Sequence, residues 1–258
     1  MYDIERQEKI LAILKEKKTI SVNKLTSMLY ASGATVRRDL VKMEQKGLII
    51  RTFGAVMINA NPSNKETSFE LRENTNISEK RLLCAKACEY IKDNSTIFLD
   101  SSSTLIHITP FLNDFNHLTI ITNGLNMANE VITKTKHQVI IPGGSITPNT
   151  NSILGPLAFS TLGRFHCNMS IMSSSALNFK EQILCESTVD QAEIKHIMVK
   201  NSDVSFCLID SSKFNKTALY QTTELKNIDY IISNNNSLTE TEAKVLRDND
   251  IIYIPVDK

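Results

Sequence analysis

Polar and charged side chains follow four short apolar runs, and together they have the chemistry of an anion-binding site. The runs end at residues 99, 122, 141 and 209. They are followed by Asp100, Ser101, Ser102, Ser103 and Thr104, by Asn123 and Gly124, by Gly143 and Gly144, and by Lys213. Hydroxyl and backbone N–H groups at the start of a helix suit a phosphate. Glycine permits close backbone approach, and lysine supplies a mobile cation for a phosphate or carboxylate.

The elements that must position these residues alternate along the chain. Strand-like apolar runs occur at 96–100, 118–122, 138–141, 169–172, 204–209, 230–232 and 251–254. Helix-like stretches occur at 78–93, 104–113, 124–135, 156–164, 187–201 and 239–248. This alternation predicts an α/β domain with a mostly parallel sheet. Ligands of such sheets bind beyond the carboxyl ends of the strands, so the four polar loops predict one binding crevice.

The first 58 residues have a different charge balance. They contain eleven Lys and Arg against six Asp and Glu, a net charge of +5, whereas residues 59–258 carry −4. A small basic segment attached to a mildly acidic remainder favours a polyanion-binding module.

The pattern inside these 58 residues predicts a winged helix-turn-helix. Apolar residues at helical spacing predict helices at 3–17, after Ser21, and after Ser32, with Gly47 as the cap that ends the third. Alternating runs at 48–51 and 56–58 predict a hairpin.

The third helix has a buried stripe of Val36, Leu40 and Met43 and an opposite face that suits the major groove. The side chains on this face are small, hydroxyl-bearing or cationic. The guanidinium groups of its arginines can donate pairs of hydrogen bonds to guanine edges or phosphates. The residues expected to contact DNA are Ser21, Asn23, Lys24, Ser32, Ala34, Thr35, Arg37, Arg38, Arg51 and Gly54. The alternative is a protein-contact module with a solvated basic face.

These segments resemble the DeoR-type bacterial transcriptional regulators. The resemblance rests on residues 21–25, on Ser-Gly-Ala-Thr-Val-Arg-Arg-Asp-Leu at 32–40 and on 47–55, with 35–40 the most specific part. It implies a DNA-binding helix-turn-helix at about 20–39. The family's wing usually carries a His and two glycines, where this chain has Phe53, Gly54 and Ala55, and Ala31 stands where Val is usual.

The remainder resembles the sensor domain of the same family, which is similar in fold to ribose-5-phosphate isomerase. The matching runs are 97–100, 121–123, 143–144, 155–156 and 210–213. The resemblance implies a phosphorylated sugar or related metabolite as effector. Three differences stand out: Ser101–Ser103 replace a glycine- and threonine-rich loop, Asn168 replaces an Asp, and Ser173 or Ser174 replaces a Gly.

A sugar-phosphate isomerase with an accessory DNA-binding domain is the alternative from another class. Isomerisation needs a carboxylate base with a tuned pKa and an acid. Asp100, Glu186, Glu193 and Lys213 are of suitable types, but no pair has a spacing that forces a catalytic arrangement. The five His are scattered, and no P-loop, Gly-x-Gly-x-x-Gly or Gly-x-Ser-x-Gly motif occurs. We therefore expect a regulator without catalytic residues, cofactor or metal.

Composition sets the remaining expectations. The 258 residues are 41% hydrophobic and 22% charged, as in ordinary globular proteins. No apolar run approaches the roughly 18 residues of a membrane helix, and the charged start excludes a secretory signal peptide. Five cysteines, an odd number, fit reduced thiols in the cytoplasm. We expect a DNA-binding domain at 1–58, a linker at 59–76 and an effector-sensing, oligomerising domain at 77–258. The protein is expected to bind operator DNA as a homo-oligomer and to act as a repressor.

Overall fold

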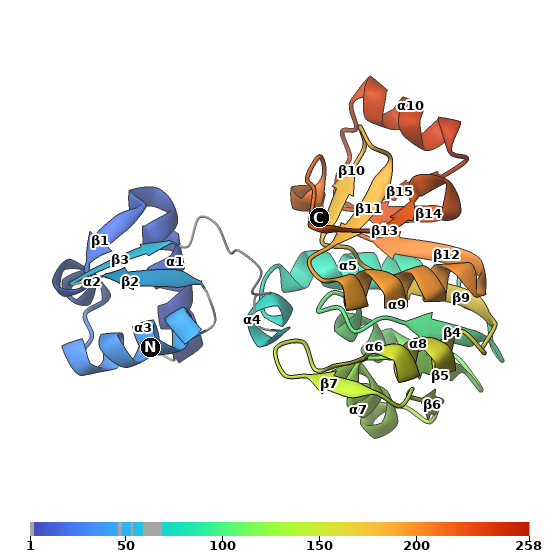
Figure 1. Ribbon diagram of the computed structural model, residues 1–258, viewed down its shortest axis with the longest axis horizontal. Coiled ribbons are helices and arrows are strands. Elements are labelled where there is room, and N and C mark those ends of the chain that lie inside the picture. The colour runs from blue at the N-terminus through green and yellow to red at the C-terminus, as the bar shows by residue number, and fades with distance from the viewer. Residues whose placement is uncertain (1–2, 46–47, 53, 59–68, 258) are drawn as a thin grey trace. The chain divides into compact units, whose positions relative to one another are not determined.

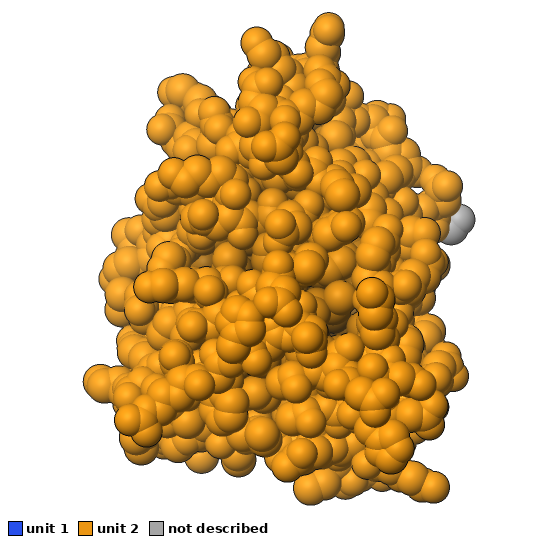
Figure 2. Space-filling model, turned by 90° about the vertical axis from the view of Figure 1, so that its right-hand side faces the viewer, with its two compact units in different colours: residues 1–68 blue, residues 69–258 orange. Residues whose placement is uncertain are grey.

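The computed structural model describes residues 3–45, 48–52, 54–58 and 69–257. The chain divides into two compact units, residues 1–68 and residues 69–258. Figure 1 labels the helices and strands of both units, and Figure 2 shows one face of the second unit in space-filling form. Gly47, Phe53 and residues 59–68 of the expected linker lie outside the described residues.

The first unit has three helices and a small antiparallel sheet, which is the predicted winged helix-turn-helix. The elements are α1 (Asp3–Lys17), β1 (Thr19–Ser21), α2 (Val22–Leu29), α3 (Gly33–Gln45), β2 (Ile49–Thr52) and β3 (Ala55–Ile58). Its core contains Ile10, Leu14, Leu25, Val36, Leu40 and Met43, each 0% exposed. The predicted caps form as well, since the hydroxyl of Ser21 accepts from Lys24 N and that of Ser32 from Thr35 N.

The sheet of the first unit contains one strand more than the sequence predicted. Residues 17–20 were expected only to break the helical pattern. Instead Thr19–Ser21 pairs antiparallel with β3, giving the strand order β1-β3-β2. Ile20 lies opposite Val56 and is buried, so its side chain explains why this short segment becomes a strand.

The second unit is built on a seven-stranded sheet in which every neighbouring pair is parallel. All seven predicted strands are present, in the order β15-β14-β12-β9-β4-β5-β6. Their bounds are β4 (Thr96–Leu99), β5 (Thr119–Thr122), β6 (Gln138–Ile140), β9 (Cys167–Met172), β12 (Ser202–Leu208), β14 (Tyr230–Ser233) and β15 (Ile252–Pro255).

Helices cover both faces of this sheet, because successive strand side chains point to opposite sides. Ile97 and Leu99 pack in one core with α5 (Ile77–Cys88), the 3₁₀ helix η1 (Leu105–Ile108), α6 (Thr109–Leu112) and α7 (Leu125–Lys134). Phe98, between them, packs in another core with α8 (Pro156–Leu162) and α9 (Val189–Lys200). A further core includes Leu246 of α10 (Glu240–Asp248).

Two smaller sheets were not anticipated. One is the hairpin of β7 (Ser145–Thr147) and β8 (Ser152–Leu154). The other joins β10 (Ala176–Asn178), β11 (Ile183–Glu186) and β13 (Tyr220–Glu224), and includes the turns η2 (Ser211–Lys213) and η3 (Leu225–Asn227) at its margins. Each begins in a segment that follows a strand of the main sheet, since β7 follows β6 and β10 follows β9.

The second unit begins inside the segment expected to be a linker. Residues Phe69–Glu73 form helix α4. Phe69 is 4% exposed and packs in the same core as Leu83 and Ile97. Burial of this aromatic side chain explains why the last part of the segment belongs to the second unit. Within the described residues, no helix is long and apolar enough to cross a membrane.

Candidate functional site

The outer face of α3 presents the predicted DNA-contacting side chains to solvent. Ala34, Arg37 and Arg38 are exposed. Thr35 is half-buried, and its hydroxyl lies 2.8 Å from the hydroxyl of Ser32 at the start of the helix. The apolar stripe of α3 is fully buried, so the helix has one structural face and one free face.

A buried ion pair fixes the orientation of α3. Arg6 in α1 places its Nε 2.5 Å from Oδ2 of Asp39, and its Nη2 donates to Oδ1 at 3.2 Å. Asp39 is 1% exposed. Asp39 follows Arg37 and Arg38 directly, so this pair turns the two arginines away from the core. Sequence reasoning treated Asp39 as part of a motif and missed its partner, which lies 33 residues away.

The other predicted contact residues of the first unit lie at the surface. Asn23 and Lys24 are exposed on α2, and Ser21 caps that helix. Gly54 is exposed at the turn between β2 and β3 with φ +79°, a conformation that favours glycine. Arg51 is half-buried and its Nη1 lies 3.4 Å from Oε2 of Glu44, so it must exchange that partner to reach a phosphate.

In the second unit, Asp100 lies at the end of β4 and organises the carboxyl edge of the sheet. It is 0% exposed. Its Oδ1 accepts from Ser102 N at 2.9 Å and its Oδ2 from Ser173 N at 3.2 Å. The loop after β4 is thereby tied to the end of β9. Asp100 is thus a buried structural carboxylate.

Lys195 of α9 forms the centre of a buried charged network. Its Nζ lies 3.2 Å from Asp100 Oδ2, contacts Glu186 Oε1, and donates to Ser173 O at 2.8 Å. Burial alone would lower the pKa of Lys195, but the carboxylates of Glu186 and Asp100 outweigh it and hold that pKa well above its usual range. Burial would raise the pKa of Glu186, and Lys195 outweighs it and lowers that pKa.

This network argues against acid–base catalysis. A general base at neutral pH needs a pKa near the operating pH and a free lone pair. Glu186 has a lowered pKa and is held by Lys195 and by the hydroxyl of Ser175. Glu193, another candidate acid, is exposed on α9. The carboxylates that sequence reasoning considered are therefore structural or solvated.

Ser101 joins three elements through hydroxyl and amide groups. Its Oγ accepts from Asn123 Nδ2 at 3.2 Å and from Ser152 Oγ at 2.7 Å, and Gln191 Nε2 donates to Ser152 Oγ at 2.9 Å. Gly124 is needed at this point, since a Cβ there would lie 3.0 Å from Ser101 Cα. The structure thus brings together the predicted residues Ser101, Asn123 and Gly124, and adds Ser152 and Gln191.

The backbone N–H groups after β4 are less available than predicted. Asp100 occupies Ser102 N, and Ser102 Oγ accepts from Leu105 N at 3.3 Å. The helix that follows Thr104 is a 3₁₀ turn of four residues. Ser103 also meets a cation, because its Oγ accepts from Lys80 Nζ at 3.4 Å.

Three basic side chains gather beside this segment, and we call them the cation cluster: Arg72, Lys80 and Lys213. Lys80 donates to Arg72 O and to Ser103 Oγ, and Lys213 donates to Ser174 O at 2.8 Å. Burial, Lys213 and Arg72 together lower the pKa of Lys80 to about 8. Burial lowers the pKa of Lys213, with Glu186 opposing and Lys195 and Arg72 reinforcing the shift. The three cations are therefore near one another, and the carboxylates of Glu73 and Asp210 oppose part of the shift at Lys80.

Gly143 and Gly144 approach parts of their own chain. A Cβ at Gly144, where φ is +146°, would lie 2.7 Å from Leu154 O, and a Cβ at Gly143 would lie 3.0 Å from Leu157 Cδ2. The packing of the β7–β8 hairpin and α8 thus accounts for both glycines. The predicted role of these two residues in effector binding has no support from their contacts.

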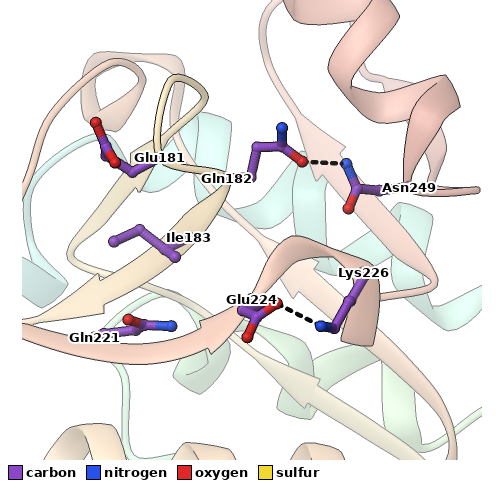
Figure 3. A pocket seen from close by; sticks show the side chains of 7 residues that line it. All are labelled: Glu181, Gln182, Ile183, Gln221, Glu224, Lys226 and Asn249. Carbon is purple, nitrogen blue, oxygen red and sulfur yellow. Dashed lines mark hydrogen bonds and ion pairs between the residues drawn. The ribbon is translucent and has the colours of Figure 1, made fainter.

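A separate pocket of about 400 Å³ lies at the sheet formed by β10, β11 and β13 (Figure 3). Its polar groups satisfy one another: Lys226 Nζ lies 2.6 Å from Glu224 Oε2, and Asn249 Nδ2 donates to Gln182 Oε1 at 2.8 Å. Its one lining lysine is already neutralised, so this pocket is a poor anion site compared with the cation cluster.

Sequence reasoning missed Arg72, Lys80 and Lys195 in the second unit. Arg72 lay in the expected linker, and the other two lay on predicted helices rather than in the loops that follow strands. One signal was available for Lys195: at helical spacing it shares a face of α9 with the apolar residues Ala192, Met198 and Val199, which are buried. A lysine in such a place requires a carboxylate partner.

Comparison with known proteins gives a separate match for each of the two units. The DeoR-like helix-turn-helix domain matches residues 6–61, and the DeoR C terminal sensor domain matches residues 75–235. The L-fucose operon activator of Haemophilus influenzae is 32% identical over 96% of this chain and 98% of its own length. The lactose phosphotransferase system repressor of Staphylococcus epidermidis is 29% identical over 94% of this chain and 96% of its own.

Among solved structures, ribose 5-phosphate isomerase A from Methanocaldococcus jannaschii is similar to 54% of this chain and 55% of its own, with TM-score 0.41 and 14% identity. A likeness at that level transfers neither activity nor residues. The sensor-domain model alone covers more than half of the chain, and the relatives match it almost from end to end. The chain belongs to the DeoR family of transcriptional regulators.

Proposed function

We propose that this regulator represses an operon for a sugar or related metabolite in the cytoplasm, and that a phosphorylated sugar controls it from the cation cluster. The relatives named above regulate an L-fucose operon and a lactose phosphotransferase system, which supports a sugar-related target. The observation that carries the effector proposal is the convergence of Arg72, Lys80 and Lys213 beside Ser103 at the carboxyl edge of the sheet.

A dianionic phosphate fits this cluster for an electrostatic reason. Lys80 and Lys213 lose solvation on burial and repel each other and Arg72, which the lowered pKa of both lysines reflects. A bound dianion replaces that repulsion with attraction and accepts hydrogen bonds from ammonium and hydroxyl groups. A neutral sugar offers no such gain, so the phosphorylated form should bind more tightly than its parent.

The second unit transmits the signal through α4 in this proposal. Phe69 N donates to Asn149 O at 2.9 Å, Arg72 O accepts from Lys80, and Glu73 O lies 3.2 Å from His107 Nε2. The same short helix therefore supplies a cation to the cluster and continues directly into residues 59–68, which lead to the DNA-binding unit.

DNA contact belongs to the first unit in this proposal, with the arginines of α3 reading bases and the α2, wing and cap residues named above contacting the backbone. A single reader of this size buries about 600–1,000 Å² on DNA, which is little for specific control. We therefore propose a homo-oligomer that presents two readers to half-sites about one helical turn apart. Analytical ultracentrifugation, free and with DNA, tests this, and a monomer in both conditions would contradict it.

The effector proposal is tested with the full-length protein and genomic fragments that it selects. Fluorescence anisotropy at fixed salt measures its affinity for such a fragment while a panel of sugar phosphates and their unphosphorylated parents is added. We expect at least one phosphate to change DNA affinity, by about five- to 150-fold for a typical coupling, and no parent sugar to match it.

Variants assign this response to the cluster. Lys80→Met and Ser102→Glu should abolish the response, the first by removing a cation and the second by placing a like charge beside the phosphate. Lys86→Met is the matched control, since Lys86 lies on the same helix in an ion pair with Glu89. Equal responses to neutral sugars, or an unchanged response in Lys80→Met, would rule out the cluster as the phosphate site.

A further inference from the structure

Strand β6 (Gln138–Ile140) forms one edge of the seven-stranded sheet, and β15 forms the other (Figure 1). An edge strand presents a row of backbone N–H and C=O groups, and natural proteins protect such edges with charges, proline or a covering element. The edge formed by β15 has this protection, because the strand ends in Pro255 and is flanked by Asp250 and Asp257.

The edge formed by β6 is apolar, and part of its backbone is turned outward. Residues 138–141 read Gln-Val-Ile-Ile and carry no charge. Gln138 N donates to Leu118 O at 3.1 Å, so the backbone groups of Gln138 face β5. Because successive residues of a strand direct these groups to opposite sides, Val139 and Ile141 direct theirs away from the sheet. Within the described residues, no strand other than β5 pairs with β6.

Exposed apolar side chains surround this strand. Ile141 is 48% exposed, and Ile146 in β7 is 57% exposed. Leu157 in α8 is 61% exposed and lies beside the segment after Ile141, because a Cβ at Gly143 would be 3.0 Å from its Cδ2. Ile132, on the helix α7 that packs beside β6, is 66% exposed. We call β6 with these four exposed side chains the β6 surface. Exposed apolar patches of this kind mark interaction sites.

The charges near the β6 surface favour a second copy of this chain as its partner. Of the two lysines that directly precede β6, Lys134 lies 2.5 Å from Glu130 and is paired with it. The one remaining lysine gives a polyanion little to bind. Residues 59–258 carry a net charge of −4, so two copies repel each other, and they do so least where the surface is uncharged.

From this surface we propose that β6 pairs antiparallel with the β6 strand of a second copy, about a two-fold axis. The proposal rests on the proposed homo-oligomer and names the surface that forms it. With Ile140 on the axis, Val139 of each copy lies opposite Ile141 of the other, and their outward N–H and C=O groups bond in both directions. A stable interface needs about 800 Å² from each partner. Three strand residues supply less than that, and the exposed side chains of α7, β7 and α8 extend the contact.

The first test is the assembly of the full-length protein. Ile141→Lys places a charge opposite the apolar Val139 of the second copy. Ile252→Lys is the matched control, since Ile252 is the same residue type, is 51% exposed and lies on the opposite edge strand, β15. Sedimentation velocity over a range of protein concentrations measures the dissociation constant of the assembly. We expect Ile141→Lys to raise that constant by about tenfold or more and the control to leave it unchanged.

The second test fixes the register of the two strands. Opposite residues that share no hydrogen bond have Cα atoms about 4.5 Å apart, which is within the range for a disulfide. Ile140→Cys should therefore cross-link to its copy under mild oxidation, as non-reducing electrophoresis would show. Ile141→Cys is the control, because the two substituted residues lie two positions out of register and too far apart for a disulfide. The five native cysteines are buried and do not compete.

The outcomes separate the β6 surface from the proposed homo-oligomer. A wild-type protein that is a monomer, both free and with DNA, removes the homo-oligomer and the β6 pairing with it. A wild-type oligomer that Ile141→Lys weakens no more than Ile252→Lys, or in which Ile140→Cys does not cross-link, keeps the homo-oligomer and overturns the β6 pairing. Circular dichroism checks the fold of the lysine variants. Should Ile141→Lys lose its fold, the cross-linking of Ile140→Cys decides alone.

Discussion

The two units hold their functional residues in opposite ways. In the first unit, the arginines of α3 are exposed, and the residues that hold the helix, such as Leu40 and Asp39, are buried. In the second unit, Asp100, Ser101 and Asn123 are buried and also join strands to loops. A DNA-reading surface can therefore change without loss of the fold, whereas the proposed effector site is part of the fold. The comparison teaches where function and stability are separable.

The largest effect should follow from removing the cation at the centre of the second unit. Lys195→Ala leaves Asp100 and Glu186 buried without their partner. Breaking a buried ion pair in this way costs about 3–5 kcal/mol of unfolding free energy. Urea denaturation of the full-length protein should show a lower midpoint for the second unit, together with loss of effector binding. A variant that kept both would show that this site is as separable as the DNA-reading face.

The corresponding change in the first unit removes the carboxylate that faces one buried charged side chain, whereas Lys195→Ala affects two. Asp39→Ala removes the buried carboxylate that contacts Arg6, which should cost about 3–5 kcal/mol of unfolding free energy and abolish DNA binding because α3 loses its orientation. The double variant Arg6→Met with Asp39→Leu replaces the pair by apolar side chains and should restore folding and DNA binding. Circular dichroism and fluorescence anisotropy measure the two properties. If the double variant folds yet fails to bind DNA, Asp39 itself takes part in recognition.

A smaller effect is expected where function and fold are separate. Arg38→Ala removes an exposed side chain on α3, so the unfolding midpoint should not change. One good bidentate contact with a base discriminates against the wrong base by about 1–3 kcal/mol. The difference in binding free energy between specific and non-specific DNA should therefore fall by that amount in the variant. Footprinting at constant salt checks this, because phosphate contacts make affinity strongly salt-dependent. An unchanged footprint would mean that α3 is not the reader.

The same contrast explains how much of the structure the sequence predicted. The reading helix, its Ser32 cap and all seven parallel strands were predicted, because each depends on local periodicity or on an apolar run. The strands β1, β7, β8, β10, β11 and β13 were missed; each has three to five residues and lies outside the main parallel sheet. Helix α4 was missed because only the burial of Phe69 in a distant core makes it part of the second unit.

The site was predicted in part for the same reason. Residues that directly follow a strand, such as Asp100, Asn123 and Lys213, were identified, because topology alone brings strand ends to one edge. Their partners Lys80, Gln191 and Lys195 come from helices far along the chain, and no spacing rule connects them. For Gly143 and Gly144, local packing gives a second reason for the glycines, so their predicted part in effector binding stays a prediction.

The smallest expected effect is a pH dependence that only the second unit should show. Burial, with Lys213 and Arg72 nearby, lowers the pKa of Lys80 to about 8. A bound phosphate is a dianion above pH 7, since its second pKa is about 6, and its charge raises the pKa of Lys80. Binding therefore takes up a proton wherever Lys80 is neutral in the free protein.

The sign follows from this proton uptake. Effector affinity should be greatest below pH 8 and should fall as the pH rises through that value, by about tenfold between pH 7 and pH 9. Lys80→Arg keeps a charge that does not titrate in this range, so it should remove most of the decline, leaving the part that comes from Lys213. Calorimetric titrations at several pH values measure it. An effector affinity that stayed constant between pH 7 and pH 9 in the wild-type protein would place the phosphate away from Lys80.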